Sequence, residues 1–222
     1  MFPRMNFPAV LFDLDGTLLD TLEDLADSAN LALGQLGFPA HPIESYKYFI
    51  GDGLENLVRR ALPEGRGDSA TLARCLELTR VHYAVGWAKK TRPYQGIPAL
   101  LDALTLRGVR MAVLSNKPEE LTRLCVEGLL AAWHFEVVSG ARQSLPRKPD
   151  PTGAIQIARR LELAPKKIVY LGDTATDMQT AVAAGMFPVG ALWGFRTAEE
   201  LRAHGAQILL ASPVDLLRLW DS

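Results

Sequence analysis

Two aspartates close to the start of the chain have the spacing and setting of catalytic carboxylates. Asp13 and Asp15 end an apolar run in the segment AVLFDLDGT, residues 9–17. Alternation along a strand places both on one side, and carboxylates at the end of a buried strand are costly unless they are paired or bind a metal. The pattern predicts a hard-cation site with one carboxylate free for chemistry. An ordinary Asp-Gly turn is the alternative.

Three further polar groups follow later apolar runs. Ser115 and Asn116 precede a predicted helix, where a hydroxyl, an amide and free backbone N–H groups can bind phosphate oxygens. Simple helix capping is the alternative for them. Lys148 lies in a proline-held loop, and its charge can balance the carboxylates and a phosphate. The neighbouring Arg147 and Lys117 are expected at the surface.

Asp173 and Asp177 form a second acidic motif. Asp173 follows the apolar run at 167–171 and is predicted to be a direct metal ligand. Asp177 belongs to the same metal site, where it would orient a metal-bound water or Lys148. Thr174 and Asp177 also fit the spacing of a helix-capping box, which is compatible with that role.

The elements that must position these residues alternate between strands and helices. In parallel sheets of this kind, ligands bind outside the carboxyl ends of the strands. We therefore predict an α/β fold with a doubly wound parallel sheet. The expected strands are 8–13, 109–114, 135–138, 167–172, 187–191 and 207–210, and the expected helices are 97–107, 118–129, 151–161, 175–185 and 213–220.

Residues 20–92 interrupt this alternation and are predicted to form an all-helical cap. Its first helix shows an apolar stripe, opened by a Thr21-x-x-Asp24 capping box and closed by Gly37. Further helices are expected near 53–62 and 69–88. The catalytic core is then expected to comprise residues 1–19 and 93–222.

Composition narrows the class of protein. The 222 residues include 24 Lys and Arg against 25 Asp and Glu, and no run of like charge predicts nucleic-acid binding. No apolar stretch predicts a membrane span or a secretory signal. Cys75 and Cys125 match no zinc spacing or disulfide framework, which fits a cytoplasmic protein. Sequence leaves monomer and homodimer open.

The ordered motifs resemble those of the haloacid dehalogenase superfamily of phosphohydrolases. These motifs are Asp13-x-Asp15-Gly-Thr, Ser115-Asn116, Lys148 and Gly172-Asp173-x-x-x-Asp177. The helical insert is similar to the cap of the phosphoglycolate phosphatase branch, through IGDG at 50–53, LVRRAL at 57–62 and RPYxG at 92–96.

The resemblance implies a mechanism. Asp13 would attack phosphorus to form an aspartyl-phosphate, and Asp15 would protonate the leaving alcohol and then activate water. Mg²⁺ would be held by Asp13, the Asp15 carbonyl and Asp173. Ser115, Asn116 and Lys148 would bind the phosphoryl oxygens.

A cap also implies a small phosphorylated metabolite as substrate, with 2-phosphoglycolate favoured. Gly51 and Gly53 would allow close backbone approach, and Lys47, Arg59 or Arg60 could meet a carboxylate. The alternatives are a sugar phosphomutase similar to β-phosphoglucomutase, a phosphatase for another small ester or pyrophosphate, and a non-catalytic phospho-acceptor or binding module.

Overall fold

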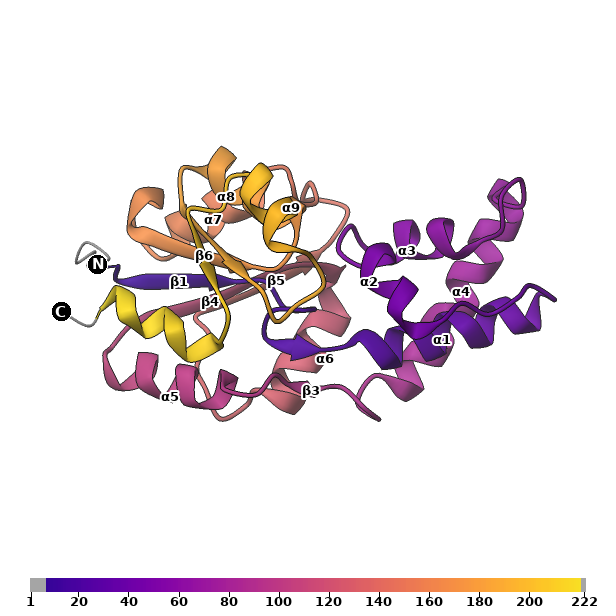
Figure 1. Ribbon diagram of the computed structural model, residues 1–222, viewed down its shortest axis with the longest axis horizontal. Coiled ribbons are helices and arrows are strands. Elements are labelled where there is room, and N and C mark those ends of the chain that lie inside the picture. The colour runs from indigo at the N-terminus through magenta and orange to yellow at the C-terminus, as the bar shows by residue number, and fades with distance from the viewer. Residues whose placement is uncertain (1–6, 221–222) are drawn as a thin grey trace.

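A computed structural model describes residues 7–220 of the chain. Its main sheet has six strands in the order β5-β4-β1-β6-β7-β8, and every neighbouring pair is parallel. The strands are β1 (Ala9–Phe12), β4 (Arg110–Pro118), β5 (Val137–Ala141), β6 (Ile168–Gly172), β7 (Phe187–Ala191) and β8 (Ile208–Leu210). The predicted α/β fold with a doubly wound parallel sheet is confirmed (Figure 1).

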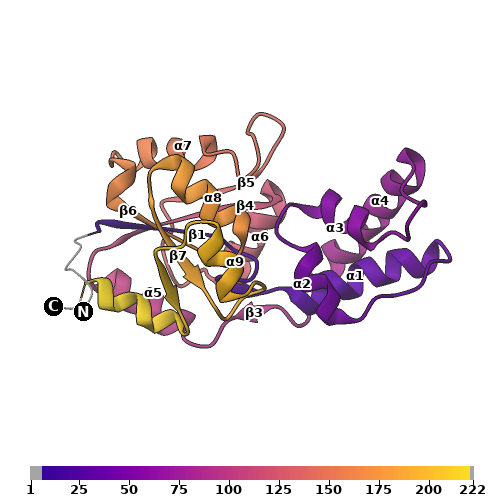
Figure 2. The same ribbon diagram turned by 45° about the horizontal axis from the view of Figure 1, so that its top comes forward.

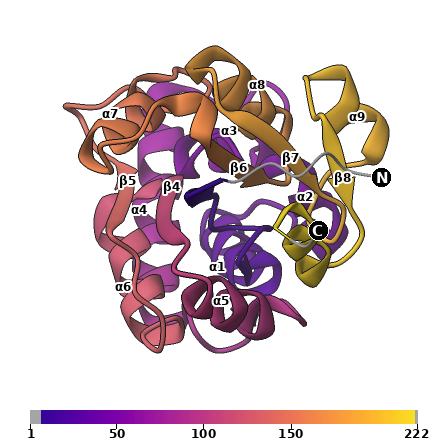
Figure 3. The ribbon, with the colours of Figure 1, turned by 90° about the vertical axis from the view of Figure 1, so that its left-hand side faces the viewer.

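Helices cover both faces of this sheet because its strands are apolar on both sides. Val10 and Phe12 of β1 pack on one face with α5 (Ile97–Leu106), α6 (Glu119–Leu129) and a C-terminal 3-10 helix (Pro213–Leu219). Ala9 and Leu11 pack on the other face with α7 (Thr152–Arg160) and α8 (Ala175–Ala184). Figure 3 shows the two helical layers on opposite sides of the sheet. This arrangement requires a strand buried on both sides.

A group of helices projects beyond the sheet and has its own apolar core. It comprises α1 (Leu22–Gln35), α2 (Tyr46–Phe49), α3 (Leu54–Ala61), α4 (Ser69–Gly86) and a 3-10 turn at Ile43–Ser45. We call residues 20–92 the helical insert. It extends to one side in Figures 1 and 2, next to the carboxyl end of β1.

Several local features differ from the sequence-based expectations. Strands β2 (Leu19–Asp20) and β3 (Arg92–Pro93) form an antiparallel ladder where the chain enters and leaves the insert. Helix α9 (Ala198–Ala203) was not expected, and the last helix has 3-10 geometry. Two-residue strands and a six-residue helix are too short to give a periodic pattern.

The expected capping box at the start of α1 is wrong. The Thr21 hydroxyl has no hydrogen-bond partner within residues 7–220, and Asp24 instead accepts from the backbone N–H groups of Lys90 and Thr91. The carboxylate thus ties the start of the insert to its end. Gly37 follows α1 with φ of 75°, which is the left-handed conformation expected of a helix terminator.

The outermost residues of the predicted core, 1–6 and 221–222, lie outside the described part of the chain. Among the helices of residues 7–220, none combines the length and the apolar character needed to cross a membrane.

Candidate active site

Asp13 lies at the carboxyl end of β1, in the middle of the sheet. Its backbone N–H donates to the carbonyl of Leu171 at 2.9 Å, which extends the β1–β6 pairing by one residue. Its side chain is buried, and Oδ1 accepts from the Lys148 ammonium at 2.7 Å. Burial and the nearby Asp177 raise the pKa of Asp13 well above its usual range, and Lys148 offsets part of that rise.

Lys148 reaches the same point from the loop before α7. Its ammonium has an acceptor for each of its three donors: Asp13 at 2.7 Å, Asp177 at 2.7 Å and the Leu114 carbonyl at 3.1 Å. Burial on its own would lower the pKa of Lys148, but Asp13 and Asp177 together raise it well above the usual range, so the side chain stays charged. The structure therefore places Lys148 where its charge acts on the carboxylates, as its loop position suggested.

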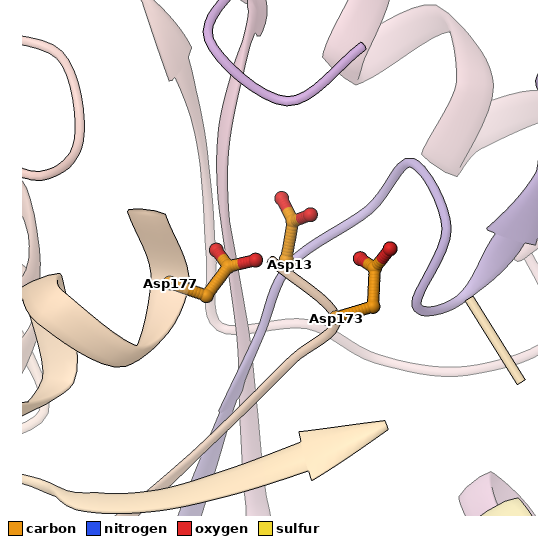
Figure 4. A group of neighbouring side chains, drawn as sticks. All are labelled: Asp13, Asp173 and Asp177. Atoms are coloured by element: carbon orange, nitrogen blue, oxygen red, sulfur yellow. The ribbon is translucent and has the colours of Figure 1, made fainter. Parts of the chain in front are cut away.

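Asp173 and Asp177 complete a cluster of buried carboxylates with Asp13. One oxygen from each residue lies within 4.8 Å of the others. Figure 4 shows the three side chains converging from β1, from the loop after β6 and from α8. Burial and the charge of Asp177 raise the pKa of Asp173 to about 7. Three carboxylates with one contacting ammonium leave an excess of buried negative charge, which fits a divalent cation.

The two acidic side chains of the second motif have different surroundings. Asp177 Oδ1 accepts from Lys148, and Oδ2 accepts from the N–H and hydroxyl of Thr174 in the predicted capping box. Asp173 accepts only from the Thr17 hydroxyl and the Phe195 N–H within residues 7–220. Asp13 and Asp173 are therefore the better candidates for direct ligands, while Asp177 contacts Lys148.

A loop after β7 contributes to the site and was not predicted from the sequence. Besides the Phe195 N–H bond, Gly194 packs so closely that a Cβ there would lie 2.4 Å from both the Asp173 Cβ and the Gly16 carbonyl. Only a glycine allows this approach. The Trp-Gly-Phe-Arg segment directly after an expected strand end was the available hint.

Ser115 and Asn116 occupy the next strand end, but their side chains already have protein partners. The Ser115 hydroxyl accepts from the Lys117 N–H at 3.2 Å, but it does not cap α6, whose N-cap position is Pro118 and has no side-chain cap hydrogen bond. The Asn116 amide donates to the carbonyls of Gly51 and Lys148 and accepts from the Lys148 N–H. In this conformation the Asn116 side chain joins the insert to the Lys148 loop, and its binding to phosphate stays a prediction.

Lys117 corrects the sequence interpretation most clearly. It was expected at the surface, yet only 3% of its side chain is exposed. Its ammonium lies 2.6 Å from Asp15 Oδ1 and 4.7 Å from the ring centroid of Tyr83 on α4. Burial on its own would lower the pKa of Lys117, but the contact with Asp15 raises it above the usual range.

A small cavity of about 40 Å³ lies between the helical insert and the strand ends. A water needs on the order of 10–15 Å³ of such space, so the cavity holds only a few waters. Its walls include Asp13, Asp15, Ser115, Asn116, Lys117, Gly51, Gly53 and several apolar side chains of the insert. Gly53 has φ of 91°, and a Cβ there would meet Arg147 and the Asn116 carbonyl at 3.2 and 3.3 Å.

The basic side chains of the insert do not reach this cavity. Arg59 pairs with Glu55 at 3.0 Å on the exposed side of α3, Lys47 pairs with Glu44, and Arg60 binds Asp52 and the Phe49 carbonyl. The prediction that Arg59 contacts substrate is therefore not supported in this conformation. Helical periodicity turns Leu54, Leu57 and Val58 inward and leaves Arg59 outside.

Comparisons with known proteins agree with this geometry. The model of the haloacid dehalogenase-like hydrolase family matches residues 10–191, which include every motif described above. The chain belongs to this family. Its relatives include phosphoglycolate phosphatases of Nitrosospira multiformis, 35% identical over 97% of this chain and 98% of the relative, and of Aquifex aeolicus, 32% identical over 96% of both.

Solved structures place the whole chain in the same fold. A crystal structure from Lactobacillus delbrueckii subsp. bulgaricus aligns with a TM-score of 0.91 and 31% identity, covering 98% of this chain and all of the other. The predicted family and the predicted enzyme class, a phosphoric monoester hydrolase of the haloacid dehalogenase type, are both confirmed.

Proposed function

We propose that this hydrolase cleaves a small phosphomonoester, with 2-phosphoglycolate as the leading candidate, through an aspartyl-phosphate on Asp13 and with Mg²⁺ as cofactor. The observation that carries the proposal is the placement of Asp13 and Asp173 at neighbouring strand ends under the helical insert, with the Lys148 ammonium in contact with Asp13. Relatives at 30–35% identity are phosphoglycolate phosphatases, which supports the substrate.

The donor set fits the cofactor. Asp13 and Asp173 offer carboxylate oxygens, which Mg²⁺ prefers, and the Asp15 backbone carbonyl is the third protein ligand that we propose. Bound there, Mg²⁺ would neutralise negative charge on the phosphoryl oxygens. Asp177 would act through Lys148, since its oxygens already accept from the protein.

The chain's own residues account for the bonds made and broken. A carboxylate oxygen of Asp13 bonds to phosphorus as the ester P–O bond breaks, and Asp15 gives its proton to the leaving oxygen. Lys117 contacts Oδ1 of Asp15, which leaves Oδ2 for that proton. Asp15 then takes a proton from water as the water oxygen attacks phosphorus. The P–O bond to Asp13 breaks, which releases phosphate and restores both carboxyl groups.

We further propose that residues 20–92 act as a cap over a core of residues 1–19 and 93–222. The separate apolar core of the insert and its position over the cavity support this division. The cavity is too small for a phosphorylated metabolite together with its waters, so the cap would open to admit substrate. A free metabolite in the cytoplasm is the expected partner, and the two buried free cysteines fit that compartment.

The test is a panel of phosphate esters, including 2-phosphoglycolate, sugar phosphates and pyrophosphate, assayed for phosphate release with and without Mg²⁺. We expect release from 2-phosphoglycolate that depends on Mg²⁺, and a loss of at least about 10³-fold in kcat for Asp13→Asn. Asp27→Asn, an exposed carboxylate paired with Lys90, is the matched control and should keep full activity.

Full turnover by Asp13→Asn would exclude Asp13 as the nucleophile. Isomerisation of a sugar phosphate primed by a bisphosphate, with little phosphate release, would instead indicate the phosphomutase alternative. Absence of any turnover or phosphoenzyme across the panel would favour a binding module.

A further inference from the structure

Lys117 and Lys148 are both buried beside the reacting carboxylates, but their hydrogen bonding differs. Lys148 has an acceptor for every donor of its ammonium. Among residues 7–220, Lys117 Nζ has a single hydrogen-bond acceptor, Asp15 Oδ1. An ammonium carries three donors, so two donors of Lys117 remain for a ligand.

The surroundings of Lys117 hold those donors at the cavity. Its ammonium packs against the face of Tyr83, whose side chain is fully buried and whose hydroxyl has no hydrogen-bond partner within residues 7–220. Both residues line the cavity. Asp15 pairs with the charge of Lys117, but buried N–H donors without acceptors remain costly, and a ligand oxygen at the cavity would satisfy them.

The other described residues that line the cavity offer an anion no second positive charge. Its insert-facing wall consists of side chains such as Leu25, Ile50, Leu54 and Leu57. Among the described residues, Lys117 is the single cationic side chain lining the cavity, because the basic residues of the insert pair with acidic neighbours outside it. These Leu and Ile side chains offer no hydrogen bonds to the hydroxyl groups of a sugar.

We propose that Lys117 recognises a carboxylate at the non-phosphate end of the substrate, so that the enzyme selects phosphate esters of short α-hydroxy acids. This inference rests on the proposed function, and it adds the residue and the chemistry that set specificity. Asp15 contacts the ester oxygen during proton transfer, and Lys117 lies beside Asp15. In such an ester the carboxylate carbon is two bonds from the ester oxygen, which places it next to the ammonium.

The experiment compares 2-phosphoglycolate with ethyl phosphate, which has the same chain length and no carboxylate. In Lys117→Met we expect the ratio of kcat/KM for the two esters to fall by about ten- to a hundredfold, the range for a lost charge-assisted hydrogen bond. Lys117→Arg should retain part of the preference. Lys89→Met, an exposed lysine at the end of the insert, is the matched control and should keep the wild-type ratio.

Binding provides a readout that is independent of turnover. In an Asp13→Asn background, the Kd of 2-phosphoglycolate measured by calorimetry should rise when Lys117→Met is added, while the Kd of ethyl phosphate should not. If Lys117 serves only Asp15, Lys117→Met weakens binding and turnover of both esters equally, and the inference is overturned. A wild-type enzyme that hydrolyses both esters without preference also overturns it but leaves the phosphatase proposal intact. Hydrolysis of neither ester would mean that the proposed function itself has failed.

Discussion

The carboxylate of Asp15 accepts a hydrogen bond from the Lys117 ammonium at Oδ1, and the same residue lines the cavity. A residue that alternates between acid and base needs a fixed position and one free oxygen. Sequence alone predicted the aspartate but not its partner. Lys117 lies three residues after the centre of β4, and the direction of its side chain depends on contact with Tyr83, which is distant in the sequence.

Removing the acid should separate the two chemical steps. Asp15→Asn should still form the aspartyl-phosphate from p-nitrophenyl phosphate, because p-nitrophenolate leaves without protonation, but water attack should be slowed by about 10²–10⁴-fold. Rapid mixing should therefore show a burst of p-nitrophenol approaching one equivalent of enzyme. Linear release at the wild-type rate would argue against the role of Asp15.

The raised pKa of Asp173 makes the stability of the metal-free protein depend on pH. The folded-state pKa of about 7 exceeds the ordinary value of 3.8, so this contribution to stability is full below about pH 4 and is lost as pH rises through 7. In EDTA, Tm should therefore fall between pH 5 and 7.5, and Asp173→Asn should flatten that fall.

Mg²⁺ binds the ionised carboxylates, so it should raise Tm more at pH 8 than at pH 6. Thermal melts of wild type and Asp173→Asn across this range provide the measurement. If Tm changes with pH equally in both proteins, Asp173 does not titrate in the folded state.

At the scale of elements, the strand ends are where sequence was most informative. A polar residue after a fully buried run is rare enough that the sequence alone locates Asp13, Ser115 and Asp173. Side-chain partners from distant segments were not accessible in this way. Asn116 looked like a phosphate ligand, but its amide is used by the carbonyls of Gly51 and Lys148, which the fold brings to it.

The junction between β6 and α8 should not tolerate a side chain. A Cβ on Gly172 would lie 2.3 Å from the Asp177 Cβ, so Gly172→Ala must shift α8 and the Asp177 contact with Lys148. We expect a loss of about 1–3 kcal/mol in the free energy of unfolding and a sharp fall in kcat. Gly34→Ala in α1, where nothing lies within 4 Å, should instead stabilise by about 0.5–1 kcal/mol. Denaturant melts of both variants test the contrast.

At the scale of the whole molecule, a few polar contacts hold the insert against the core. Arg196, beside the start of α9, donates to the carbonyls of Lys47 and Ile50 and lies over the ring of Tyr48. Thr176 donates to Asp52 at 2.7 Å. Phe195 and Leu121 of the core also pack against the apolar core of the insert. These polar and apolar contacts would break when the proposed cap opens.

Weakening the contacts between the insert and the core should favour an open arrangement, in which the insert lies away from the cavity. Arg196→Met removes both donors to the insert, so we expect faster hydrogen exchange at residues 47–54 and a KM raised by about three- to tenfold. Arg202→Met, an exposed arginine on the following helix α9, is the control. Unchanged exchange in Arg196→Met would show that these contacts do not govern closure.

The two-residue ladder of β2 and β3 has an implication for how this architecture can diversify. Leu19 pairs with Pro93 and Asp20 with Arg92, so the chain leaves the sheet layer and returns to it at one point. Neighbouring strands are about 4.8 Å apart, and any folded segment whose ends meet at that spacing could be grafted there without rethreading the sheet. With the insert acting as the proposed cap, exchange of this one segment would alter the wall that faces the substrate, while the acidic residues at the strand ends stay in place.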